Sequence, residues 1–229
     1  MMADGHRERI RDRFDEENID TIPEIYVLER IIHNVVVRRD VSAAARELMD
    51  TFGSLAKIID APKSELLKID GVGPAVATFL RTIPSFYRKY RLSKWEDVRI
   101  FSDAETIIAY MKDKLTGYKT EVLAVMCLDS KFRLLNCKTV FEGNIHDMNI
   151  NLRKLLDVVI NSGAERAVIA HNHPNSELVP SSEDIHTTKL IYNALHYAGV
   201  QLDDHIIVND SGAVSLIQTG SFPCEPTII

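Results

Sequence analysis

Three residues in the second half of the chain have the types and the spacing of ligands for a metal ion. His171, with His173 two residues later, directly follows the apolar run at 167–170, which is typical of a buried strand. Residues two apart on a strand leave from the same face, so both imidazoles point to one side. Asp184 lies eleven residues beyond His173 and opens a segment with helical apolar spacing. Two imidazoles and a carboxylate suit zinc, and three protein ligands leave a fourth tetrahedral position for water, as in catalytic zinc sites.

Asp184 also has a purely structural interpretation. Residues Ser181 to Asp184 fit the Ser-x-x-acid pattern of a capping box, in which the fourth residue bonds back to the start of the helix. That role alone leaves the paired histidines unexplained, and the two roles are compatible. The sequence therefore favours Asp184 as a metal ligand, with or without a capping role.

The same stretch matches a known motif. It reads His-x-His-Pro, six residues, Ser-x-x-Asp, and thereby resembles the JAMM metal motif of the JAB1/MPN metallopeptidases. The matching residues are His171, His173, Pro174, Ser181 and Asp184. Within that superfamily, the run at 171–174 resembles the RadC family of bacterial proteins, historically labelled DNA-repair proteins. Further segments that look like RadC signatures lie at 5–9, 38–41, 52–55 and 204–208.

The resemblance implies a zinc-dependent hydrolase that cleaves an amide or isopeptide bond without a covalent intermediate. Glu121 begins an apolar strand-like run and matches the glutamate at the start of the superfamily's first core strand, which acts as the catalytic base. Glu142, after the next expected strand, is the alternative base. Ser181 matches the residue that hydrogen-bonds the developing oxyanion. The resemblance also implies a peptide or protein substrate, whose identity the sequence does not reveal.

Composition restricts the class of protein. The net charge is −6, and no apolar run approaches the roughly 18 residues that span a bilayer, so we expect no membrane association. The first twenty residues are charged and are not a secretory signal. Three widely spaced cysteines, at positions 127, 137 and 224, argue against a disulfide framework and fit a reducing cytoplasm. The oligomeric state does not follow from these features.

The elements that must position these residues fall into two domains, expected at 1–97 and 98–229. The first is predicted to be all-helical, with helices at 23–33, 41–52, 55–59, 63–69 and 74–90, the last broken near Pro84. Gly53 is expected to end the second of these helices.

The second domain is predicted to be an α/β or α+β mixed sheet, and the family resemblance makes it an MPN (JAB1/cytidine-deaminase-like) domain. Strands are expected at 121–128, 132–141, 167–170, 205–208 and 213–217. Helices are expected at 103–115, with Ser102 and Glu105 as its capping box, at 147–160, with Asp147 as its N-cap, and at 182–198.

A second motif lies between the last two predicted helices of the first domain. Gly71 and Gly73 allow a tight turn, and the amides at the start of the following helix suit a DNA phosphate. The segment resembles a helix-hairpin-helix element, and a run with no acidic residue follows it, carrying Arg81, Arg88 and Lys89. The alternatives are a hairpin that only turns the chain and a basic helix face that is only solvated.

Two hypotheses from different classes follow. The first is a RadC-like zinc metallopeptidase, in which the helical domain docks the enzyme to DNA. The second is a DNA-binding repair or recombination accessory protein whose metal site is structural or vestigial. A nuclease is a weaker third alternative, because nucleases favour carboxylate-rich sites with two metal ions.

Overall fold

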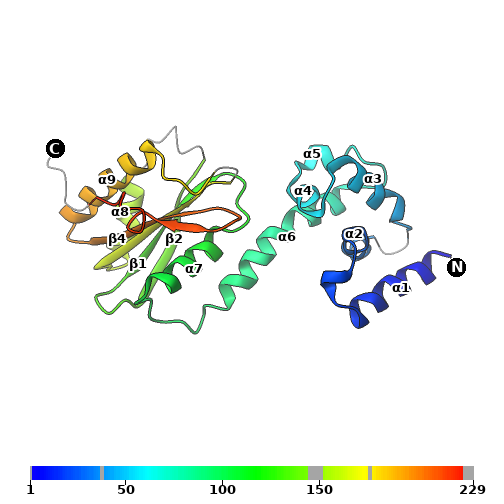
Figure 1. Cartoon of the computed structure of the whole chain (residues 1–229), viewed down its shortest axis with the longest axis horizontal. Coiled ribbons are helices and arrows are strands. Elements are labelled where there is room, and N and C mark those ends of the chain that lie inside the picture. The colour runs from blue at the N-terminus through cyan, green and yellow to red at the C-terminus, as the bar shows by residue number, and fades with distance from the viewer. Residues whose placement is uncertain (1, 37–38, 144–151, 175–176, 224–229) are drawn as a thin grey trace. The chain divides into compact units, whose positions relative to one another are not determined.

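The computed structural model describes residues 2–36, 39–143, 152–174 and 177–223. The chain forms two compact units, Met1–Phe86 and Tyr87–Ile229 (Figure 1). The sequence put the boundary at residues 97 and 98, whereas the structure divides the chain inside one helix. The reason is that the end of this helix binds the second unit: Arg91 Nε donates to Asp113 Oδ1 at 2.9 Å.

Every element in the described part of the first unit is helical, as predicted. The elements are α1 (Met2–Glu16), a short 3-10 helix (Ile19–Thr21), α2 (Glu24–His33), α3 (Ser42–Phe52), α4 (Leu55–Asp60), α5 (Lys63–Leu66) and the first part of α6 (Pro74–Ser93). One apolar core joins α2 to α6, with side chains such as Leu28, Leu48, Ile58, Leu66 and Leu80 fully buried.

Two local predictions for this unit have different outcomes. Gly53 ends α3 in the left-handed conformation, with φ of 84°, which confirms its predicted role. The predicted break near Pro84 is wrong, because α6 runs through this proline without interruption. A proline removes only one hydrogen bond from the helix ladder. The rest of this twenty-residue helix outweighs that loss.

The second unit is built on a five-stranded mixed sheet, which confirms the predicted sheet type. Its strands are β1 (Glu121–Leu128), β2 (Leu134–Gly143), β3 (Arg166–Asn172), β4 (Gln201–Val208) and β5 (Ala213–Ser215). They lie in the order β2-β1-β3-β4-β5. The β3–β4 pair is parallel and the other pairs are antiparallel.

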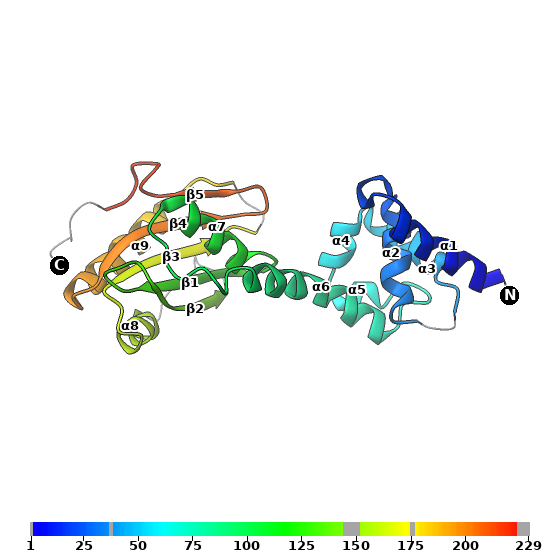
Figure 2. The same cartoon turned by 90° about the horizontal axis from the view of Figure 1, so that it is seen from below.

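Helices cover both faces of this sheet. The helix α7 (Ala104–Leu115) packs on the face that carries Val122, Met126 and Val168. The helices α8 (Leu152–Asn161) and α9 (Ser182–Tyr197) pack on the opposite face, with Leu123, Val125 and Ile169. Figure 2 shows α7 and α8 on opposite sides of the sheet. Successive strand residues alternate between the two cores, as the pleat requires.

The N-cap of α7 lies one residue later than predicted. Residue 102 is not the cap of α7, because the carboxylate of Asp103 accepts from the backbone N–H of Thr106 at 2.7 Å and is the N-cap. The N–H three residues beyond the cap is the usual partner of a capping side chain, and for the Thr106 N–H that position is Asp103. The predicted cap at Asp147 lies outside the described residues.

No helix in the described ranges combines the length and the apolar character that crossing a membrane would require.

Candidate metal centre

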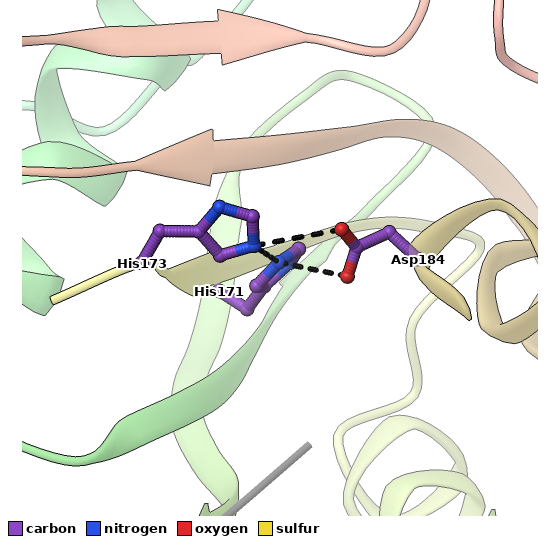
Figure 3. A group of neighbouring side chains, drawn as sticks. All are labelled: His171, His173 and Asp184. Atoms are coloured by element: carbon purple, nitrogen blue, oxygen red, sulfur yellow. Dashed lines mark hydrogen bonds and ion pairs between the residues drawn. The ribbon is translucent and has the colours of Figure 1, made fainter. Parts of the chain in front are cut away.

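The three predicted ligands converge at one end of the sheet. His171 is the sixth residue of β3, His173 directly follows the strand, and Asp184 lies in the first turn of α9. One ligand atom from each residue lies within 4.8 Å of the others, and no other group of this kind occurs among the described residues. Figure 3 shows the two imidazoles and the carboxylate turned toward a common point.

The distances between the ligand atoms fit one small divalent ion. His171 Nε2 lies 2.9 Å from His173 Nε2 and 3.0 Å from Asp184 Oδ1. His173 Nε2 lies 3.5 Å from Asp184 Oδ2. Ligand atoms about 2.0–2.1 Å from a tetrahedral zinc ion lie roughly 3.3 Å apart. The donor set therefore fits zinc.

Each histidine is held by its second nitrogen. His173 Nδ1 lies 3.0 Å from the carbonyl oxygen of Glu177, and His171 Nδ1 lies 2.7 Å from Nε2 of His205. Metal-binding histidines usually have such an outer partner, which sets the ring orientation. Both Nε2 atoms are thereby left for the common point.

Asp184 has both of the roles that its sequence context allows. Its backbone N–H donates to Ser181 Oγ at 3.0 Å, and its Oδ2 accepts from the Ser181 backbone N–H at 2.8 Å, which completes a capping box. Its Oδ1 is the atom that faces His171. The helix cap therefore orients the carboxylate toward the histidines.

Hydrogen bonds and charges within this cluster shift the pKa values of Asp184 and His173. Burial opposes the ionisation of Asp184, but hydrogen bonds from His171 and His173 outweigh it and hold the pKa of the carboxyl well below its usual range. The hydrogen bond with Asp184 raises the pKa of His173, against the opposing effect of burial, and the charge of Glu121 adds to the rise. A cluster that stabilises positive charge in this way suits a cation.

Comparison with known proteins agrees with this geometry. Residues 101–221, more than half of the chain, match the model of the family described as RadC-like JAB domain. The chain belongs to the RadC family. It is 28% identical to a UPF0758 protein of Psychrobacter sp. (strain PRwf-1), over 97% of this chain and 99% of that protein. It is 30% identical to a UPF0758 protein of Fusobacterium nucleatum subsp. nucleatum, over 94% and 96% of the two chains.

The register of the RadC sheet separates the two glutamates that the sequence leaves as alternatives for the base. Leu123 pairs with His171, and continuing this antiparallel register brings Glu121 opposite His173. Glu142 pairs with Val122, whose side chain lies in the core under α7. Cross-strand partners share a face, so Glu121 lies on the face of His171 and Glu142 on the other.

Ser181 lies beside the ligands but its hydroxyl is engaged. Its Oγ donates to Asp184 Oδ2 at 2.7 Å. The backbone N–H of the same serine binds the same oxygen, so the carboxylate keeps a donor if the hydroxyl turns away. Ser181 thus lies next to Asp184, as the motif predicts, and its hydroxyl takes part in the cap of α9.

The two glycines proposed for DNA contact differ in exposure and packing. Gly71 is exposed in the left-handed conformation, with φ of 78°, and an added Cβ would lie 3.2 Å from Cβ of Ala44. Gly73, half-buried, directly precedes α6. Close packing against α3 is therefore sufficient to explain the first glycine.

The three basic residues of α6 that were proposed for DNA contact also differ in their surroundings. Arg88 Nη1 donates to the carbonyl of Thr116 at 3.1 Å, and its guanidinium lies 4.0 Å from the ring centre of Tyr118. That side chain is therefore committed to the second unit. Arg81 and Lys89 are exposed.

Three residues near the centre were not identified as functional from the sequence. Asn172 lies between the two histidines, Thr188 lies one turn after Asp184 in α9, and His205 lies in β4. Each is at least 95% buried, and each makes a side-chain hydrogen bond close to the ligands. A polar residue between two metal-binding positions of a buried strand was the available signal for Asn172.

Proposed function

We propose that this RadC-family chain is a zinc-dependent hydrolase that cleaves an amide or isopeptide bond. The observation that carries the proposal is the convergence of His171, His173 and Asp184 in the geometry of one zinc ion, with Glu121 on the same face of the sheet. Three protein ligands leave a coordination position open, as a hydrolytic site needs.

The side chains around the centre have separate roles in this proposal. Bound zinc supplies Lewis-acid activation of water and of the scissile carbonyl. Glu121 accepts the proton of the attacking water and returns it to the leaving amine. The hydroxyl of Ser181 turns from Asp184 to donate to the developing oxyanion. Asp184 retains the Ser181 backbone N–H during that turn, so its orientation persists.

The first experiment measures zinc. The purified protein is expected to contain about one zinc ion per chain, and His173→Ala is expected to lose it. His186, an exposed residue of α9, provides the matched control, because His186→Ala removes a histidine outside the cluster. Stoichiometric zinc in His173→Ala would contradict the site.

The second experiment tests the reaction. Zinc-loaded protein is screened against peptide and isopeptide libraries, with Glu121→Gln as the inactive comparison and Glu142→Gln as the control on the opposite face. We expect cleavage by the wild type and by Glu142→Gln only. Equal cleavage by Glu121→Gln would remove this residue as the base.

A second candidate function is DNA binding by the first unit, and one observation favours it. Pro74, Thr78 and Arg81 are all exposed and follow one another at helical spacing, so one open stripe runs from the first turn of α6 to a basic side chain. Such a stripe suits a phosphate backbone. We propose this function for the case in which the metal centre supports no hydrolysis.

Salt dependence tests this second candidate. The affinity for branched or single-stranded DNA should fall as the salt concentration rises. Arg81→Ala should weaken binding, and it should make the plot of log affinity against log salt concentration less steep by about the amount that one phosphate contact contributes. Arg88→Ala is the control, because its guanidinium contacts Tyr118. Equal weakening by both variants, or by neither, would contradict the proposed stripe.

A further inference from the structure

A chain of buried hydrogen bonds leads from α9 through β4 to the metal ligand on β3. Thr188 Oγ1 lies 2.5 Å from the carbonyl oxygen of Asp184 and 2.6 Å from His205 Nδ1. His205 Nε2 lies 2.7 Å from His171 Nδ1. The three side chains come from three elements, and none is more than 1% exposed.

The direction of the donors in this chain decides which nitrogen of His171 carries a proton. When the Thr188 hydroxyl donates to the Asp184 carbonyl, its oxygen accepts from Nδ1–H of His205. His205 Nε2 then has a lone pair and accepts from Nδ1–H of His171. His171 Nε2, which faces Asp184 and His173, is left with a lone pair. The opposite direction places a proton on that same Nε2 atom.

The two histidine ligands differ in how strongly their outer partners determine which ring nitrogen carries the proton. The partner of His173 is the carbonyl of Glu177, which only accepts, so it selects Nδ1–H without help. The partner of His171 is an imidazole, which donates or accepts according to its own tautomer. A third group is needed to select that tautomer, and Thr188 is the group in contact with the far nitrogen of His205.

We propose that Thr188 and His205 are positioning residues that hold His171 as its Nδ1–H tautomer, with the Nε2 lone pair directed at the metal ion. This inference rests on the proposed zinc site and deepens it. It assigns a role to two residues that touch neither the ion nor the substrate. It also gives a role to a threonine hydroxyl that is fully buried between α9 and β4.

Two substitutions at one position test the proposal. Thr188→Val keeps the shape of the side chain and removes the hydroxyl, whereas Thr188→Ser keeps the hydroxyl. The zinc dissociation constant is measured by competition with a chromophoric chelator. We expect Thr188→Val to bind about 10- to 100-fold more weakly, the usual cost of losing an outer-shell partner, and Thr188→Ser to bind as the wild type does. Equal affinity in Thr188→Val and wild type would overturn the relay.

A spectroscopic readout separates positioning from simple packing. Long-range 1H–15N correlation spectra of the zinc-loaded wild type should show His205 protonated at Nδ1 and unprotonated at Nε2. A His205 protonated at Nε2 would overturn the proposal whatever the affinities are. Absence of zinc binding by the wild type would instead remove the proposed function, and this inference with it.

A second pair of variants keeps the test decisive if Thr188→Val does not fold. His205→Gln retains a carbonyl that accepts from His171 Nδ1, and His205→Leu does not. We expect zinc to bind at least tenfold more tightly to the glutamine variant than to the leucine variant. Equal affinities in this pair would overturn the requirement for an acceptor beside His171.

Discussion

The side chain of Asn172 holds the start of β1: its Oδ1 accepts from the backbone N–H of Val122 at 2.7 Å. Its Nδ2 donates to the carbonyl of Thr120 at 3.0 Å. Both partners are neighbours of Glu121. The residue between the two candidate histidine ligands therefore fixes the backbone on either side of the proposed base, so one strand pair positions both histidines and the base.

Replacing Asn172 should destabilise the second unit. Asn172→Ala leaves the buried N–H of Val122 without an acceptor, and such a group costs about 1–3 kcal/mol. Trp95, the one tryptophan of the chain, packs on Phe101 and Tyr110 in this unit, so its fluorescence in urea measures the unfolding of this unit.

A matched control exists for this measurement. Asn136 also makes a side-chain hydrogen bond in the same unit, to Ser162 at 3.0 Å, but it is only partly buried. Asn136→Ala should therefore cost less than Asn172→Ala. An equal fall in the free energy of unfolding in the two variants would show that the contact with β1 stabilises the unit no more than an ordinary side-chain hydrogen bond does.

The charge of Glu121 should be measurable at His173. Because Glu121 adds to the raised pKa of His173, Glu121→Gln should lower this pKa in the metal-free protein. Glu142→Gln should leave it unchanged, because Glu142 lies on the opposite face of the sheet. Histidine NMR titrations of the three proteins make the comparison. An equal fall in both variants would contradict the assignment of the two faces.

The stability of the metal-free protein should depend on pH through His173. The folded pKa of His173 is raised above its ordinary value of 6.5, mainly by the hydrogen bond with Asp184. The stabilisation is therefore complete below pH 6.5 and is lost as the pH rises through the folded value. Burial lowers the pKa of His205, so around pH 6.5 only the unfolded state binds this proton, and stability gains from it as the pH rises. This opposite contribution is common to the wild type and to a variant at His173, so it cancels in their difference.

The measurement compares wild type with His173→Gln. Urea unfolding is followed by Trp95 fluorescence between about pH 6 and pH 9, where the linkage acts. The free energy of unfolding of the wild type minus that of the variant should decline across this range, because only the wild type has the His173 contribution. A parallel decline in both proteins would show that another group is responsible.

The clustering of the three candidate ligands was predictable because each step depends on short-range geometry. The alternation of a strand places His171 and His173 on one side, and the capping pattern places Asp184 at the start of a helix. The bounds of β1 were predicted correctly for a similar reason, since a continuous apolar run ended by Asp129 has few other conformations.

The outer contacts were not predictable in this way, because they depend on how distant segments pair. His205 reaches His171 only through the parallel register that sets it beside Ile169, and Thr188 reaches His205 only because α9 packs on β4. The choice between Glu121 and Glu142 likewise needs the register of β1 with its two neighbours. Local patterns contain none of this information.

A series at Ser181 should separate helix capping from chemistry. Glycine is nearly as good an N-cap as serine, whereas alanine costs about 1 kcal/mol. Ser181→Ala should therefore destabilise the second unit, Ser181→Gly should do so by only a few tenths of a kcal/mol, and Ser181→Thr should retain both the cap and the hydroxyl.

Activity should follow a different order, because alanine and glycine both lack the hydroxyl. With a peptide found by the library screen, both variants should lose about 100- to 1,000-fold in kcat, the usual cost of one oxyanion donor, while Ser181→Thr stays active. If Ser181→Gly cleaves as fast as the wild type, Ser181 only caps α9 and orients Asp184.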